Sequence, residues 1–73
     1  MDIKTKFSVT DRVYFMNRNN IHSGVIGEFT VNVKKEFNII YYVDFVEDGK
    51  TIYNKGFNEI FLFANKEELL ASL

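Results

Sequence analysis

The stretch DRVYFMNRNNIHSGVIG, residues 11–27, decides the predicted fold. Its first part alternates, with Val13 and Phe15 on one side of an extended chain, which is typical of a half-buried β-strand. Three Asn in quick succession then predict a loop, because Asn tolerates left-handed backbone and bonds nearby backbone groups. The next strand contains Gly24 and Gly27, and glycine inside a strand marks a bulge, a bend or a close backbone approach. The stretch therefore predicts two strands, the second sharply bent.

The composition favours one small domain over residues 1–73. The chain has no Cys, and 47% of its residues are hydrophobic and 16% aromatic. A domain of this size buries only about 60% of the surface that its unfolded chain exposes. Without disulfides it depends on dense apolar packing, which eight Phe and four Tyr can supply. Thiol chemistry and Cys-based zinc sites are excluded.

Three further strands are predicted in the second half of the chain. Residues 38–46 alternate but carry apolar side chains on both faces, which predicts a central strand that is covered on both sides. The dipeptide at residues 48–49, Asp-Gly, lies between alternating runs and is a strong hairpin pattern. Residues 51–54 are therefore predicted to return as a fourth strand, and residues 59–63 to form a fifth.

The last segment, residues 65–73, is predicted to be a helix. Asn65 is a favourable N-cap, and Glu68 completes a pattern similar to a capping box. Leu69, Leu70 and Leu73 form an apolar stripe at helical spacing. A helix of two turns does not persist alone in water, so this helix must dock on the strands.

The pattern D-x-V-Y from Asp11, a polar loop and G-x-I from Gly24 resembles the start of Tudor-like and KOW-like small barrels. In those proteins the Asp closes the turn into the first strand, and the Gly opens the second strand where the chain bends. The resemblance covers residues 7–63. It implies a mainly β fold, a five-stranded Src-homology-3-like small barrel, followed by the short C-terminal α-helix. The whole chain also resembles uncharacterised small bacterial or phage proteins of this barrel type that end in a short KEELL helix.

The residues offer little catalytic chemistry. His22 is the only His, and the adjacent Ser23 would point to the opposite face of a strand, so they cannot form a nucleophile–base pair. The pattern from Gly24 to Gly27 lacks the Lys and the helix of a phosphate-binding loop. We expect no enzyme activity, no cofactor and no metal.

Aromatic side chains are the positive feature of the predicted surface. Tyr14, Tyr42 and Tyr53 lie on strand faces outside the best core pattern or near it. Tudor-like barrels use clustered aromatic residues to bind cationic or methylated side chains, and aromatic rings also stack bases. The alternative is that these Tyr pack under the C-terminal helix. Together with Arg18 and His22, they are the candidate partner-binding residues.

Charge is unevenly distributed along the chain. Six Lys and Arg against three Asp and Glu give residues 1–35 a balance of +3, and three against seven give residues 36–73 a balance of −4. The net charge of −1 differs from the basic excess that free nucleic-acid-binding domains carry. The candidate phosphate contacts are Arg12, Arg18, Lys34 and Lys35.

The predicted function is therefore a non-enzymatic protein-interaction module, with self-association included. A peptide would add to an edge strand or dock in an aromatic groove. One alternative is a nucleic-acid-binding accessory protein, and another is a small inhibitor protein encoded by a mobile element. No apolar run reaches the roughly 20 residues needed to span a bilayer, and the first residues lack a signal-peptide core. We therefore expect a cytoplasmic protein without a membrane partner.

Overall fold

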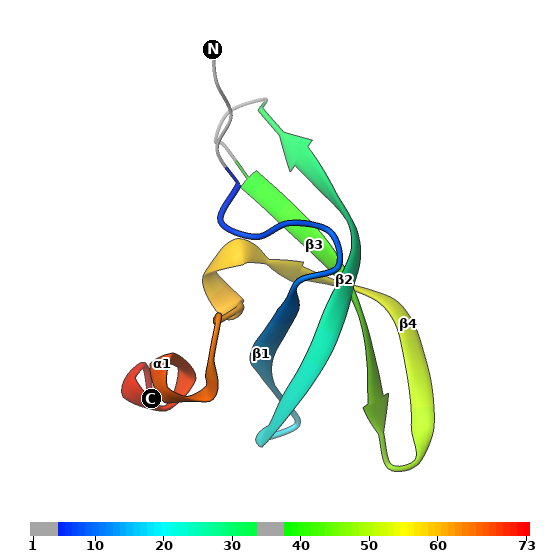
Figure 1. Cartoon of the computed structure of the whole chain (residues 1–73), viewed down its shortest axis with the longest axis vertical. Coiled ribbons are helices and arrows are strands. Elements are labelled where there is room, and N and C mark those ends of the chain that lie inside the picture. The colour runs from blue at the N-terminus through cyan, green and yellow to red at the C-terminus, as the bar shows by residue number, and fades with distance from the viewer. Residues whose placement is uncertain (1–4, 34–37) are drawn as a thin grey trace.

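The computed structural model describes residues 5–33 and 38–73. These residues form a mainly β structure, an open antiparallel sheet followed by a 3₁₀ helix and a short α-helix (Figure 1). The strands pair in sequence order and are β1 (Arg12–Asn17), β2 (Asn20–Asn32), β3 (Asn38–Glu47) and β4 (Lys50–Asn58). The helices are the 3₁₀ helix η1 (Glu59–Phe61) and α1 (Lys66–Ala71).

Two tight turns fix the register of the described hairpins. Arg18 and Asn19, between β1 and β2, have φ of 53° and 63°. Asp48 and Gly49, between β3 and β4, have φ of 52° and 76°. Two successive residues with left-handed backbone match the twist of a two-residue hairpin, so both predicted loops are confirmed. A third predicted hairpin tip, at residues 34–36, lies outside the described residues.

The sheet bends where two bulges lie side by side. β2 pairs with β1 through its first half and with β3 through its second, and the register shifts between Ile26 and Glu28. β3 and β4 have a second shift next to Asp44, whose carboxylate accepts the Asn54 backbone N–H at 2.8 Å. Gly27 lies between these two sites, because its Cβ position is 3.8 Å from the side-chain oxygens of Asn54 and Asp44. The bend predicted in the second strand is therefore a bulge that continues across the sheet.

The hydrophobic core lies on the inner face of the bent sheet. Val13 and Phe15 of β1 are fully buried, as their alternation predicted. On β3 the inner face is buried from Ile39 to Phe45, whereas Val46 on the outer face is 60% exposed. The prediction that this strand is covered on both sides is therefore wrong. The contiguous core consists of Phe7, Val13, Phe15, Ile26, Ile39, Tyr41, Val43, Phe45 and Leu62.

The prediction of a fifth strand at residues 59–63 is wrong, because residues 59–61 form the 3₁₀ helix η1. The Asn58 side chain accepts the Ile60 backbone N–H at 3.2 Å and starts η1, because Asn at this position competes for backbone groups that a strand would pair. β4 instead continues to Asn58, beyond the predicted residues 51–54. After η1, one antiparallel bridge joins Phe63 to Tyr14 of β1. The described residues therefore form four strands in an open sheet, and a closed five-stranded barrel is not established.

The C-terminal helix is confirmed, although it is shorter than predicted. The Asn65 side chain accepts the Glu68 backbone N–H at 2.8 Å, as expected of an N-cap. Leu69 is the one buried residue of α1. The helix packs chiefly against β1, so the short helix docks on the sheet (Figure 1).

Candidate functional site

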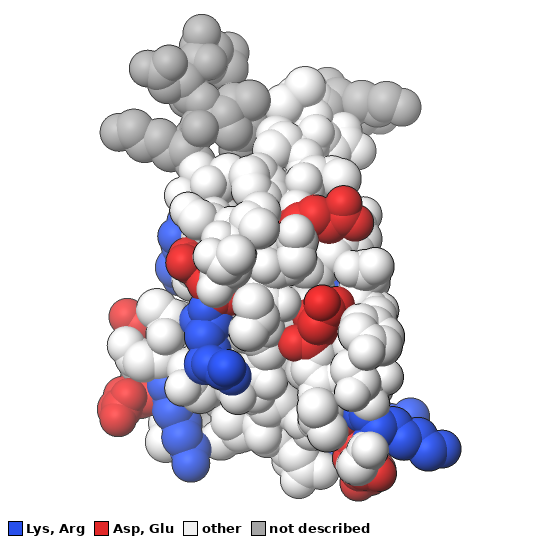
Figure 2. Space-filling model, turned by 45° about the vertical axis from the view of Figure 1, so that its right-hand side comes forward, with Lys and Arg blue, Asp and Glu red and all other residues white. Residues whose placement is uncertain are grey.

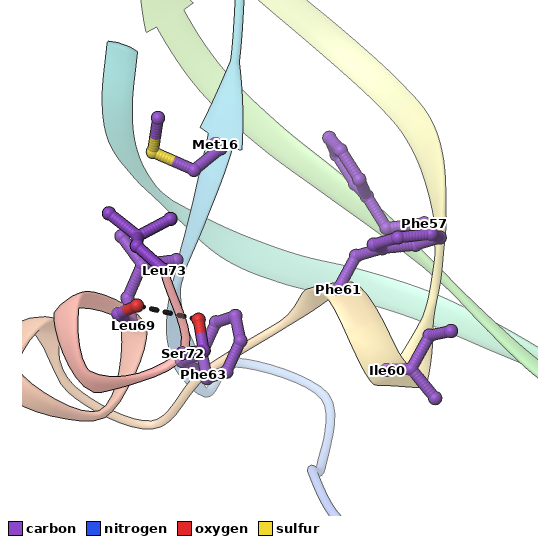
Figure 3. Close-up of a pocket in the computed structure, with 8 residues that line it drawn as sticks. All are labelled: Met16, Phe57, Ile60, Phe61, Phe63, Leu69, Ser72 and Leu73. Carbon is purple, nitrogen blue, oxygen red and sulfur yellow. Dashed lines mark hydrogen bonds between the residues drawn. The ribbon is translucent and has the colours of Figure 1, made fainter. Parts of the chain in front are cut away.

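An apolar groove of about 470 Å³ lies between η1 and α1 (Figure 3). Phe57 and Phe61 lie on one side of it, Leu69 and Leu73 on the other, and Phe63 between them. The groove therefore lies between the end of the sheet and the C-terminal helix. Its lining residues are Met16, Phe57, Ile60, Phe61, Phe63, Leu69, Ser72 and Leu73.

The first wall is η1, and a hydrogen-bond network holds it in place. Glu59 accepts a hydrogen bond of 2.6 Å from the hydroxyl of Tyr41, which is buried in the core. The Asn58 cap fixes the start of the same turn. With the backbone held in this way, Ile60 and Phe61 remain 73% and 59% exposed. Two large apolar side chains are thus presented to solvent on a fixed backbone.

The N-terminal segment joins the same network. The Phe7 backbone N–H donates to the Tyr41 hydroxyl at 3.2 Å, and the Lys6 backbone N–H donates to Glu59 Oε2 at 3.2 Å. Burial, and then the hydrogen bond to the Glu59 carboxylate, raise the pKa of Tyr41 above 10.0. The Tyr41 hydroxyl therefore stays protonated and acts as a structural donor behind the groove wall.

The floor of the groove is supported by the core. Phe63 and Tyr14 exchange two backbone hydrogen bonds of 2.8 and 2.9 Å, which place Phe63 against the outer edge of β1. The Phe57 ring packs on the buried Phe15, with ring centroids 4.5 Å apart. Met16, at the end of β1, completes the lining and is 36% exposed. The wall formed by η1 and the floor of the groove are therefore held by the sheet.

The second wall is α1. Leu69 is buried at its base, and Leu73 is 76% exposed at its end. The Ser72 hydroxyl donates to the Leu69 carbonyl at 2.6 Å, so the only polar side chain lining the groove already has a hydrogen bond. The side chains of the lining therefore favour apolar side chains of a ligand.

The structure does not bring the predicted aromatic residues together. Tyr14 and Tyr42 are half-buried, whereas Tyr53 on β4 is 71% exposed. In the described part of the chain no ring contact joins any two of them, and none of the three lines the groove. Tyr14, Tyr42 and Tyr53 therefore do not form an aromatic cage.

His22 packs on core aromatic rings, and it also lines a shallow hollow with Arg12 and Asp44. Its ring stacks on Phe15, with centroids 6.0 Å apart, and lies 5.6 Å from the ring of Phe45. Its Nε2 is buried without a hydrogen bond, 3.8 Å from a carboxylate oxygen of Glu47. The imidazole therefore belongs to the inner face of the sheet.

The candidate phosphate contacts that are described do not converge. Arg12 and Arg18 flank the two ends of β1, about 20 Å apart at roughly 3.3 Å per residue. Arg18 already lies 3.9 Å from Glu47. Lys34 and Lys35 lie outside the described residues. Figure 2 shows basic and acidic side chains interspersed on the face that it displays, unlike the single-sign surface that phosphate binding favours.

Sequence reasoning missed the residues that form the groove. Residues 59–63 were interpreted as a strand, which would have buried alternate side chains. A hint was present, because residues 60–63 read I-F-L-F without a polar residue. A short strand next to a turn cannot bury four large side chains in succession on one face.

Other kinds of site are not supported by the residues that can be described. Within residues 5–33 and 38–73, no three His, Cys, Asp or Glu side chains are grouped closely enough to hold a metal ion. None of the helices in this part of the chain has the length and apolar character to cross a membrane.

The fold and the groove define a small, mainly β protein with an apolar groove beside its C-terminal helix. Comparison of the chain with protein-family models, with curated proteins and with solved structures found no match. The functional conclusion therefore depends on the groove itself.

Proposed function

We propose that this protein is a non-enzymatic interaction module that binds a short apolar peptide segment of another protein. The observation that carries the proposal is the groove of about 470 Å³, whose lining is apolar apart from one hydrogen-bonded Ser. Its volume is in the range of pockets that take small ligands or a few side chains. Ile60 and Phe61 project from a fixed turn, so the aromatic wall needs little rearrangement to bind.

The size of the groove favours a peptide over a second copy of the chain. Eight residues line it, whereas a standard protein–protein interface uses about 20–30 residues on each side. An occupant that fills the groove alone is therefore a short segment with a few large apolar side chains. The lining has no charged side chain to pair with, which disfavours charged side chains in the bound part.

Strand addition is a weaker mechanism for this protein. β4 is an edge of the sheet, but it is bulged at Asn54, whose φ is 53°, and it carries exposed Lys55. Bulges and lysines on an edge strand oppose pairing with another strand. The groove, rather than the edge, is the proposed binding surface.

We also infer that the sheet closes into a small Src-homology-3-like barrel. The bridge between Tyr14 and Phe63 supports this, because it brings the chain after η1 beside the free edge of β1. In such a barrel the groove would lie at the closing seam. The proposed peptide binding does not depend on this closure.

Selection from a random-peptide library displayed on phage tests the proposed function. We expect the enriched peptides to share large apolar residues. The variant Phe61→Asp places a charge in the groove wall and should weaken their binding by about 30-fold or more, as for an interface hot spot. The matched control is Tyr53→Asp, which alters another exposed aromatic residue, away from the groove.

Two results would contradict the proposal. One is a selection that yields no apolar consensus, or peptides that bind Phe61→Asp as well as the parent chain. The other is self-association, measured by gel filtration with light scattering, that Phe61→Asp abolishes, because the occupant would then be a second copy.

A further inference from the structure

The two walls of the groove are attached to the protein in different ways. η1 is tied to the core through Glu59 and the buried Tyr41. α1 is tied through Leu69, which is 1% exposed but lies outside the contiguous core. The side chain that anchors α1 therefore packs at the groove and not in the centre of the sheet.

The remaining contacts of α1 are few. Leu70 and Leu73 are 49% and 76% exposed, and the linking residues Ala64 and Asn65 are exposed as well. The helix packs chiefly against β1. A six-residue helix has too few internal hydrogen bonds to persist once it leaves the sheet.

We infer that α1 opens and closes as a unit separate from the sheet, so that the groove exists only in molecules whose α1 is docked. Segments with few buried apolar contacts open at a lower free energy than core strands. The core residues on β1 to β3 and Leu62 contact one another without Leu69, so they stay packed when α1 leaves.

If the groove binds a peptide, which is the proposed function, then the docking of α1 and the binding of the peptide are coupled. A peptide that touches both walls binds only the docked molecules, and its apparent affinity falls with their fraction. By linkage, the bound peptide also stabilises α1. The docking of α1 then controls peptide binding, because the groove is complete only while α1 is docked.

Amide hydrogen exchange, measured by NMR on the whole chain without any ligand, tests the separate opening of α1. The backbone amides of α1 should exchange with protection at least about tenfold lower than the amides that pair β2 with β3. Leu69→Ala should remove the remaining protection of α1 and leave the β2–β3 amides unchanged. Leu70→Ala, on the exposed side of the same helix, is the control and should change neither.

Equal protection of α1 and the sheet, or an equal loss in both on Leu69→Ala, would overturn the inference. A second arm uses the phage-selected peptides, which Leu69→Ala should bind about tenfold more weakly than Leu70→Ala does. Equal binding by the two variants would overturn the coupling. If no peptide is selected, the proposed function fails, while the exchange measurement still decides whether α1 opens separately.

Discussion

Gly24→Ala gives the sharpest test of how the sheet is built. A Cβ at Gly24 would lie 2.5 Å from Val43 Cγ1 and 2.6 Å from the carbonyl oxygen of Asp44. It would also lie 3.1 Å from Phe45 Cβ. Both short contacts involve the central strand β3, and a backbone oxygen there cannot move without breaking strand pairing.

The expected cost follows from this overpacking. Forcing an extra carbon into a packed site typically destabilises by about 1–3 kcal/mol. For a domain of this size, about 2 kcal/mol lowers the melting temperature by roughly 8–16 °C. Gly24→Val adds two further carbons at the same place and should cost more.

Gly27→Ala is the matched control, three residues along the same strand. A Cβ there meets nothing closer than 3.8 Å, and its φ is outside the left-handed region. Its stability should change by less than about 1 kcal/mol, with a gain favoured because Ala restricts the unfolded chain. Thermal and urea unfolding followed by circular dichroism measure both variants. Equal melting temperatures for the two variants would refute the close packing of β2 on β3.

Two further predictions concern the buried polar groups. The raised pKa of Tyr41 means that its stabilising contribution is complete below pH 10.0 and is lost as pH rises through the raised value. Tyr41→Phe should therefore lose less stability than the parent chain as pH rises, measured by urea unfolding. Identical losses in the two proteins would contradict this prediction. His22→Phe removes the Nε2 that has no hydrogen bond, beside the rings of Phe15 and Phe45. It should stabilise the fold by about 1 kcal/mol, measured as a higher melting temperature. A melting temperature as low as that of His22→Ala would show that the nitrogen is needed.

The sequence predicted the local elements best where one short-range interaction decides the backbone. Asn and Gly with left-handed φ specify the two hairpin turns, and Asn65 specifies the start of α1. The inner face of β1 followed directly from alternation, because side chains on a strand point to opposite faces in turn. On β3 both faces are apolar in sequence, and only the structure shows that the face from Ile39 to Phe45 is the inner one.

The candidate site was not predicted, because its residues acquire their exposure from tertiary contacts. Phe61 and Ile60 are as apolar as the buried Leu62 beside them. The Asn58 cap and the hydrogen bonds that Glu59 accepts from Tyr41 and Lys6 hold the turn that exposes them. Conversely, His22 was expected at the surface, and its pairing with Phe15 across β1 and β2 places it inside.

The stretch at residues 11–27 separates what the sequence determines from what the tertiary structure decides. By itself the sequence determined that it forms two strands joined by a tight turn, since alternation and turn residues act within a few positions. Only the tertiary structure decided that Gly24 is needed for close approach to β3, that the bulge lies at Gly27, and that α1 packs against β1. These features depend on residues distant in the chain, and a local pattern carries no information about which strand or helix will pack against it.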